Sequence, residues 1–226
     1  MDHAARLRLF QLVSPALPVG AFSYSEGLEL LVQRGAIAGV EALETWLVAE
    51  LQRGAVAIEA AALAPLAAAW RQWRQGVAAD ACALESLDGW LLVQREAPEL
   101  RAQQRQMGQS LLQLLADLGW PLPGPVAPLA WPAAFAWAAV CLELDSPAIE
   151  EAYLYGWVAN QISAAVRLVP LGPTHGQRLQ LALASLLAER AVHLAAADPH
   201  QLWNGGVGAG LAQLQHAELY SRLFRS

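Results

Sequence analysis

The stretch Leu118–Leu142, LGWPLPGPVAPLAWPAAFAWAAVCL, is the longest uncharged run in the sequence, and it decides between a membrane span and a buried helix. A membrane-spanning helix needs about 20 consecutive apolar residues. Five prolines interrupt this run, at Pro121, Pro123, Pro125, Pro128 and Pro132. The proline-free remainder, AAFAWAAVCL, has about half of the required length. The run therefore predicts a proline-rich loop followed by a buried helix, and no membrane partner.

On both sides of this run, apolar residues recur every three or four positions, which is the period of an amphipathic helix. Good helix formers fill the segments between glycines and prolines. No stretch has the alternating β-branched pattern of a strand, so no sheet is expected. The fold class is predicted as all-α, a single-domain compact bundle of roughly nine or ten helices. The expected helices cover residues 24–34, 40–60, 61–75, 80–95, 98–118, 132–143, 147–168, 176–197 and 210–222.

One helical domain is expected over residues 1–226, because no long polar linker or fixed repeat divides the chain. Residues 1–8 are expected to be a flexible start. Residues 198–210 are expected to form a mobile loop, because they include the glycine-rich stretch NGGVGAG and glycines lose the most backbone entropy on ordering. Residues 211–226 are then predicted to form a C-terminal helix and a docking tail.

Charge and composition exclude several classes of function. The formal net charge is -6, and the 14 cationic residues are all arginines scattered along the chain, so no nucleic acid partner is expected. Without lysine there is no P-loop lysine and no Schiff base. Cys82 and Cys141 form neither a disulfide framework nor a zinc motif, and the first residues lack the apolar core of a signal peptide. The expected location is cytoplasmic.

Catalytic motifs are absent from the sequence, including HExxH, GxSxG, GxxxxGK and CxxC. Glu189 and His193 share one helix face, but an ordinary surface contact is the more common use of such a pair, and no metal site is predicted. Two alternatives stay open. One is a helical enzyme whose site gathers Glu189, His193 and His216, and the other is a membrane-peripheral protein that uses the Trp-rich segment 119–142.

The segment Ser14–Glu29, SPALPVGAFSYSEGLE, has features of a rigid loop that leads into a helix. Ser23 and Glu26 have the S-x-x-E spacing of a capping box, which predicts that the helix begins at Tyr24. Gly35 lies where a left-handed C-terminal cap would end it. The predicted buried stripe of this helix is Leu28, Leu31 and Val32.

The part of this segment that reads LPVGAFSYSEGLE closely resembles the N-terminal signature of the UreF family of urease accessory proteins. Three further segments resemble the same family in order and spacing. They are ELRAQQRQMGQSLL at Glu99–Leu112, YLYGWVANQISAAVRLVPLGPTHGQRL at Tyr153–Leu179, and HAELYSRLFRS at His216–Ser226.

The resemblance implies an all-helical homodimer that binds a second accessory protein, UreD or UreH, and with it recruits the GTPase UreG. This complex inserts nickel into apo-urease while UreG hydrolyses GTP. The chain would then be a non-enzymatic adaptor or chaperone that regulates UreG, with no cofactor of its own, since the complex handles the nickel.

Site residues follow from the resemblance, weighed against the chemistry of each side chain. Tyr24, Ser25 and Glu29 are expected to line a partner-facing surface, and Arg167 and Gln177 to face the GTPase. The end of the chain is expected to be a docking peptide, because Arg and aromatic residues carry much of the binding energy at interfaces. Its partner-binding residues are His216, Tyr220, Arg222, Leu223, Phe224 and Arg225. The alternative is a terminal helix that packs on its own core.

Overall fold

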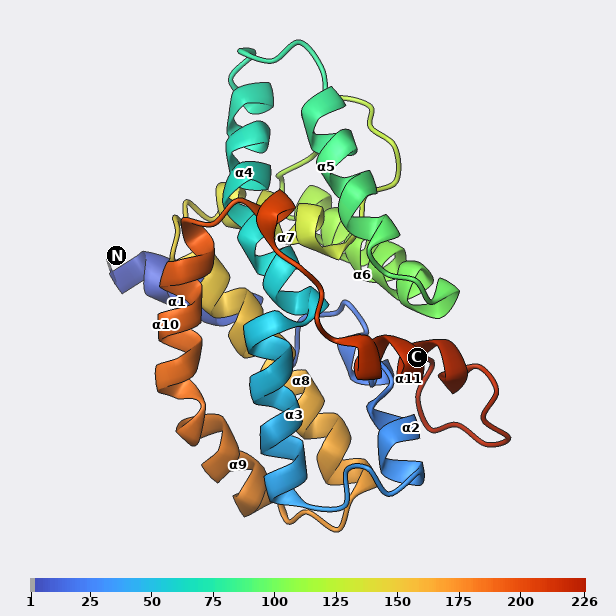
Figure 1. Ribbon diagram of the computed structural model, residues 1–226. Coiled ribbons are helices and arrows are strands. Elements are labelled where there is room, and N and C mark those ends of the chain that lie inside the picture. Colours follow the sequence, from blue (N-terminus) through green and yellow to red (C-terminus); the bar gives the residue numbers. More distant parts are fainter. Residues whose placement is uncertain (1–2) are drawn as a thin grey trace.

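The computed structural model describes residues 3–226, and its regular elements over that range are all helical (Figure 1). This part of the chain contains eleven α-helices and two short 3-10 helices, η1 Ala21–Ser23 and η2 Pro199–Gln201. The prediction of an all-α, single-domain compact bundle is confirmed. The α-helices are α1 His3–Leu12, α2 Leu28–Gln33, α3 Val40–Arg53, α4 Ala55–Arg74, α5 Cys82–Val93, α6 Pro98–Asp117, α7 Trp131–Cys141, α8 Ala148–Leu168, α9 Pro173–Ala182, α10 Ala184–Ala195 and α11 Val207–His216.

Helix α7 lies at the centre of the molecule, packed between α4 and α6. Its residues from Pro132 to Cys141 are all buried, which confirms the predicted buried helix after a proline-rich loop. The rings of Trp70 and Trp137 are 4.8 Å apart, and Trp70 Nε1 donates a hydrogen bond to the carbonyl oxygen of Ala133. A helix that is apolar on all sides is stable here because other helices cover every face.

Within the described part of the chain, one stretch is long and apolar enough to cross a membrane, residues 40–74, and 72% of its most apolar window is buried inside the molecule. This stretch is two helices, α3 and α4, separated by Gly54. The expected boundary between residues 60 and 61 was wrong. Pro65 does not break α4, and it lies on the exposed side of that helix.

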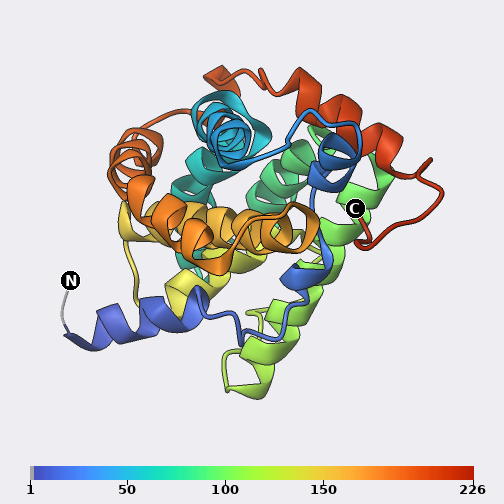
Figure 2. The ribbon, with the colours of Figure 1, turned by 90° about the horizontal axis from the view of Figure 1, so that it is seen from below.

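The N-terminal region differs from the prediction in two respects. Helix α1 was not expected and extends from one side of the body (Figure 2). The helix expected to begin at Tyr24 instead begins at Leu28, because Glu26 (φ 52°) and Gly27 (φ 87°) are both left-handed and turn the chain first. The C-terminal cap at Gly35 is confirmed by its φ of 73°.

The C-terminal helix is shorter than predicted. Helix α11 begins at Val207, inside the expected loop, and ends at His216 instead of residue 222. Residues 217–226, called the tail below, form turns and bends that bond to other parts of the chain. The 198–210 segment contains η2, Pro199–Gln201, and the Gly205 amide donates to the carbonyl oxygen of Arg53. The expected helix 176–197 is two helices, α9 and α10, which meet at Leu183.

Candidate functional site

The tail folds back onto the loop that precedes α2. The backbone amide and the hydroxyl of Ser25 both donate to the carbonyl oxygen of Ser226, at 2.8 and 2.7 Å. The Arg225 amide donates to the carbonyl oxygen of Ser23 at 2.9 Å. Ser226 is fully buried, and its hydroxyl bonds to the side chain of Gln103 on α6. The signature loop therefore forms a seat for the tail of the same chain.

Glu29, on the first turn of α2, is the acceptor at the centre of this seat. Its carboxylate accepts the backbone amides of Leu223 at 2.6 Å and Phe224 at 3.1 Å. Burial alone would raise the pKa of Glu29, but the Leu223 amide, His216 and the Phe224 amide together outweigh burial and lower it. Glu29 thus stays ionised while it holds the tail.

His216, the last residue of α11, is fully buried between two carboxylates. Its Nε2 lies 3.0 Å from Glu29 and its Nδ1 lies 3.2 Å from Glu99 on α6. Each ring nitrogen of His216 thus lies within hydrogen-bond distance of a carboxylate oxygen. Arg222 of the tail pairs with the other oxygen of Glu99. His216, Arg222 and the two carboxylates thus close the tail onto α2 and α6.

An aromatic contact completes the seat. The Phe224 ring is buried, and the guanidinium of Arg167 on α8 lies 4.4 Å from its centroid. Arg167 also donates to the carbonyl oxygen of Phe22 in the signature loop at 2.9 Å. Tyr24, also buried, donates its hydroxyl to Gln106 of α6. The side chains of Phe224 and Arg167 thereby connect the tail to α8 as well.

The structure brings most of the predicted site residues together, at the seat itself. They are Tyr24, Ser25, Glu29, Arg167, His216, Arg222, Leu223, Phe224 and Arg225. Gln177 is exposed on α9, a helix that lies away from the C-terminus in Figure 1, and Tyr220 is fully exposed. The tail packs on its own core, as in the alternative considered from the sequence, but as turns and bends and not as a helix. The role of these residues in partner binding stays a prediction.

Sequence reasoning missed three members of the seat: Glu99, Gln103 and Ser226. Glu99 and Gln103 are four residues apart on one face of α6, and both bond to groups at the end of the chain. Both lie in the ELRAQQ part of a segment that resembles the UreF family, and their spacing was the available signal. Ser226 carried no signal, since its contribution is a backbone carbonyl and a hydroxyl.

Helix α11 exposes apolar side chains beside the tail. Val207, Leu211 and Leu214, called the α11 stripe below, are 68%, 53% and 39% exposed and follow one another at four- and three-residue spacing. Trp203, just before the helix, is 88% exposed. The opposite face of α11 is the buried one and includes His216. An amphipathic helix that turns a second apolar stripe toward water has the composition of a binding surface.

A buried ionic network lies beneath the seat. Arg95 bonds to Glu59 at 2.8 Å and lies 3.9 Å from Glu26, and all three side chains are buried. Tyr153 donates its hydroxyl to Glu59 at 2.7 Å, and Trp157 donates Nε1 to Glu26 at 3.2 Å. Burial lowers the pKa of Arg95, but the two carboxylates outweigh burial and raise it. Arg95 therefore stays charged and holds α4 against the signature loop.

The residues proposed for an enzymatic site are not gathered. Glu189 and His193 are exposed on α10, whereas His216 is buried at the end of α11. Across residues 3–226, no group of three His, Cys, Asp or Glu side chains is placed to bind a metal ion. The Trp-rich segment 119–142 contributes α7 to the core.

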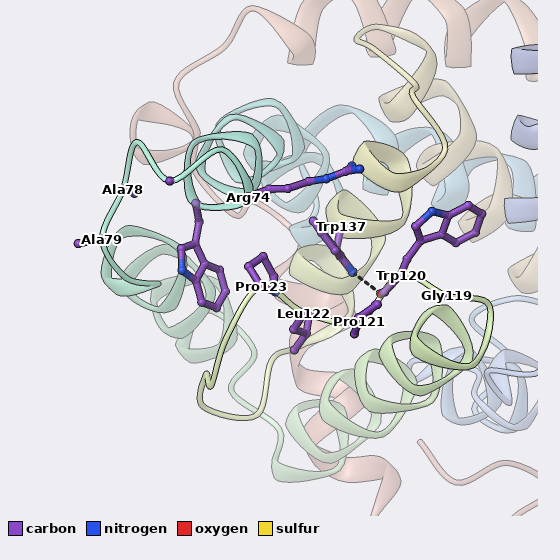
Figure 3. Close-up of a pocket in the computed structure, with 11 residues that line it drawn as sticks. Arg74, Ala78, Ala79, Gly119, Trp120, Pro121, Leu122, Pro123 and Trp137 are labelled. Carbon is purple, nitrogen blue, oxygen red and sulfur yellow. Dashed lines mark hydrogen bonds between the residues drawn. The ribbon is translucent and has the colours of Figure 1, made fainter.

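An open cavity of about 650 Å³ lies at the other end of the molecule (Figure 3). Its walls come from the end of α4 and from the proline-rich loop, and include Trp73, Trp120 and Trp137. Arg74 extends along it, 5.9 Å from the Trp137 ring centroid. The proline-rich loop is tied to α7 here, because Trp137 Nε1 donates to the carbonyl oxygen of Trp120. The walls combine indole rings with one cation.

Comparison with known proteins places this geometry in a family. The family model described as UreF matches residues 37–184. The chain belongs to the UreF family. Several curated relatives carry the name urease accessory protein UreF. The protein of Alkalilimnicola ehrlichii is 41% identical over 225 residues, which cover 98% of this chain and 96% of the relative.

Two cyanobacterial relatives extend the comparison. The UreF protein of Nostoc sp. is 40% identical over 97% of this chain and 95% of its own length, and that of Synechocystis sp. is 38% identical over all of both chains. The matched model region stops before α11 and the tail, but the alignment with the Synechocystis protein covers the whole chain and includes them. The tail seat therefore lies in the region that aligns with that relative.

Proposed function

We propose that this UreF-family chain is an accessory protein of urease maturation and acts as a non-enzymatic adaptor in the cytoplasm. With UreD or UreH and the GTPase UreG it forms the complex that inserts nickel into apo-urease, and it regulates the GTPase. It joins this complex as a homodimer. The names of its relatives support the urease role.

The observation that carries the adaptor role is the surface made by the α11 stripe and the tail. Trp203 and Tyr220 flank this surface, and both are almost fully exposed. Large aromatic side chains and arginines are the residues that contribute most to binding at protein interfaces. Arg222 and Arg225 provide exposed guanidinium groups on the same segment. A partner that covers this surface would bury apolar area that is now in contact with water.

The test is to measure complex formation by size-exclusion chromatography with light scattering. The full chain and a version that ends at Tyr220 are each run alone, with the UreD or UreH protein, and with that protein and UreG. We expect a heavier complex with the full chain and its loss with the shortened one. Truncation also removes the groups that Glu29 binds, so a point variant is needed.

Leu211→Glu places a charge in the α11 stripe without removing a buried contact. We expect it to weaken the complex by at least about tenfold, since a buried unpaired carboxylate costs more than 1.4 kcal/mol. Leu181→Glu is the matched control, because Leu181 is 75% exposed on α9. If the full chain forms no complex, or if Leu211→Glu binds as well as Leu181→Glu does, the adaptor surface proposed here is wrong.

A further inference from the structure

A second cavity, of about 360 Å³, lies under the signature loop between α6 and α8. Loop residues from Leu12 to Phe22 form one side, and α6, α7 and α8 form the others. Its volume is within the range of small-molecule sites, about 300–1,000 Å³. It shares Gln103 with the tail seat, but neither the adaptor role nor the α11 stripe requires it.

Aromatic side chains of α7 and α8 form part of the wall of this cavity. They include Trp131 and Phe135 of α7, and Tyr153 and Trp157 of α8. The Phe135 ring meets Trp131 at 5.5 Å and Tyr153 edge-on at 5.2 Å, so three of the four rings are fixed by one another. Rings that are held in place attract a cation with their faces at little entropic cost.

Two carboxyl groups and a buried amide are among the polar groups that line the cavity. Glu26 and Glu59 line it, and Arg95 lies against both of them, so the two carboxyl groups share one cation. Gln104 also lines it and is 3% exposed. Its Nε2 donates to Glu59, but its Oε1 has no hydrogen-bond partner among the described residues. A buried acceptor without a donor is unfavourable and would be satisfied by a ligand N–H.

From these observations we propose that the cavity binds a small organic cation, a primary ammonium group on an apolar or aromatic body. The ammonium group offers donors to the Gln104 amide and a positive charge to the two carboxyl groups that share Arg95. The apolar body lies against the rings of α7 and α8. Phe22, 69% exposed, and Tyr155, 43% exposed, are lining residues that also reach solvent, and they mark the entrance.

Gly156 makes the proposal testable without disturbing the core. It lines the cavity from α8, and a Cβ added there would meet no atom within 4 Å. Gly156→Phe therefore fills the cavity with a ring, and Gly156→Leu fills it with a smaller side chain. The matched control is Gly89→Phe, because Gly89 is a helical glycine of α5 with the same open surroundings, outside the cavity.

The experiment is isothermal titration calorimetry of the full chain with 2-phenylethylammonium and with 2-phenylethanol, its uncharged counterpart of equal size. We expect the ammonium ion to bind at least about tenfold more tightly than the alcohol, the ratio that 1.4 kcal/mol of charge and cation–π attraction produces. Gly156→Phe and Gly156→Leu should each weaken that binding by about tenfold or more, and Gly89→Phe should leave it unchanged. Melting curves show whether each variant is folded.

Three results would overturn the proposal: no heat from the ammonium ion, equal affinity for the alcohol, or binding that both Gly156 variants retain. The last result would indicate general attraction of cations to a chain with net charge -6. Each of these outcomes is independent of complex formation with the urease accessory proteins, so failure of one proposal does not imply failure of the other.

Discussion

Replacing Glu50 by Gln should make the protein more stable above neutral pH. Glu50 lies near the end of α3, 8% exposed, against two glycines. A Cβ at Gly206 would lie 3.0 Å from its Oε1, and one at Gly54 would collide with its carboxylate. Burial raises the pKa of Glu50 to about 7, with Arg95 opposing and Glu26 adding to the shift. The ordinary value is 4.5.

The sign of the effect follows from proton binding. Between pH 4.5 and about 7 the folded protein holds a proton on Glu50 that the unfolded chain has released, so stability falls as the pH rises through this window. At pH 8 the full shift is expressed, and ionised Glu50 costs about 3 kcal/mol. Glutamine has nearly the same shape and no charge, so Glu50→Gln removes this cost.

We expect Glu50→Gln to be more stable than the parent chain by up to about 3 kcal/mol at pH 8, and within about 1 kcal/mol of it at pH 5. For a domain of this size the gain corresponds to a rise in Tm of about 6–12 °C. The measurement is thermal and urea unfolding followed by circular dichroism at both pH values and equal ionic strength.

The control is Glu44→Gln, an exposed carboxylate on the same helix. It should leave the difference between the two pH values unchanged, because water solvates that group in both states. If the stability difference between Glu50→Gln and the parent is the same at pH 5 and pH 8, Glu50 does not titrate in this range and the reasoning is refuted.

Further predictions concern packing, the ionic network and the tail. Gly108→Ala should lower the free energy of unfolding by more than about 2 kcal/mol, because the added Cβ would lie 2.6 Å from a backbone oxygen of the loop before α7. Gly89→Ala adds a Cβ with no atom within 4 Å and should raise the free energy of unfolding by up to about 1 kcal/mol. Urea unfolding measures both changes. Arg95→Met should cost about 3–5 kcal/mol in the same assay, since it leaves the buried Glu59 without its cation. Glu29→Gln should speed hydrogen exchange of the tail amides at least about tenfold with little change in global unfolding, and unchanged exchange would contradict the seat.

The sequence predicted the helices whose periodicity is strong. The period of apolar residues located α6 and α8 to within a residue or two, and the five prolines correctly separated α7 from a membrane span. The error between α3 and α4 arose because proline was weighted above glycine as a helix breaker. Pro65 has solvent beside it, whereas Gly54 leaves room for the Glu50 carboxylate. Whether the proline or the glycine ends a helix depends on residues that are close in space, and the pattern along the sequence does not contain them.

The sequence predicted most of the residues of the site, but it did not predict how they are arranged. The Ser23–Glu26 spacing suggested a cap, but Ser25 bonds to Ser226, 201 positions away, and Glu26 bonds to Gln103 on α6. Contacts over such sequence separation leave no periodic signal, so local rules gave the wrong start for α2. Similarly, the tail was expected to be helical because its residues permit a helix, but Glu29 offers its amides a buried acceptor instead.

Both ends of α11 are fixed to the body of the protein. At its start, the Gly205 amide donates to the carbonyl oxygen of Arg53 at 2.7 Å, and at its end His216 is enclosed by Glu29 and Glu99. A helix held in this way presents its stripe in one orientation before any partner arrives. Binding then requires little further ordering, so more of the apolar area buried at the interface contributes to affinity. Loosening the seat through Glu29→Gln should therefore weaken partner binding even though the Glu29 side chain is buried.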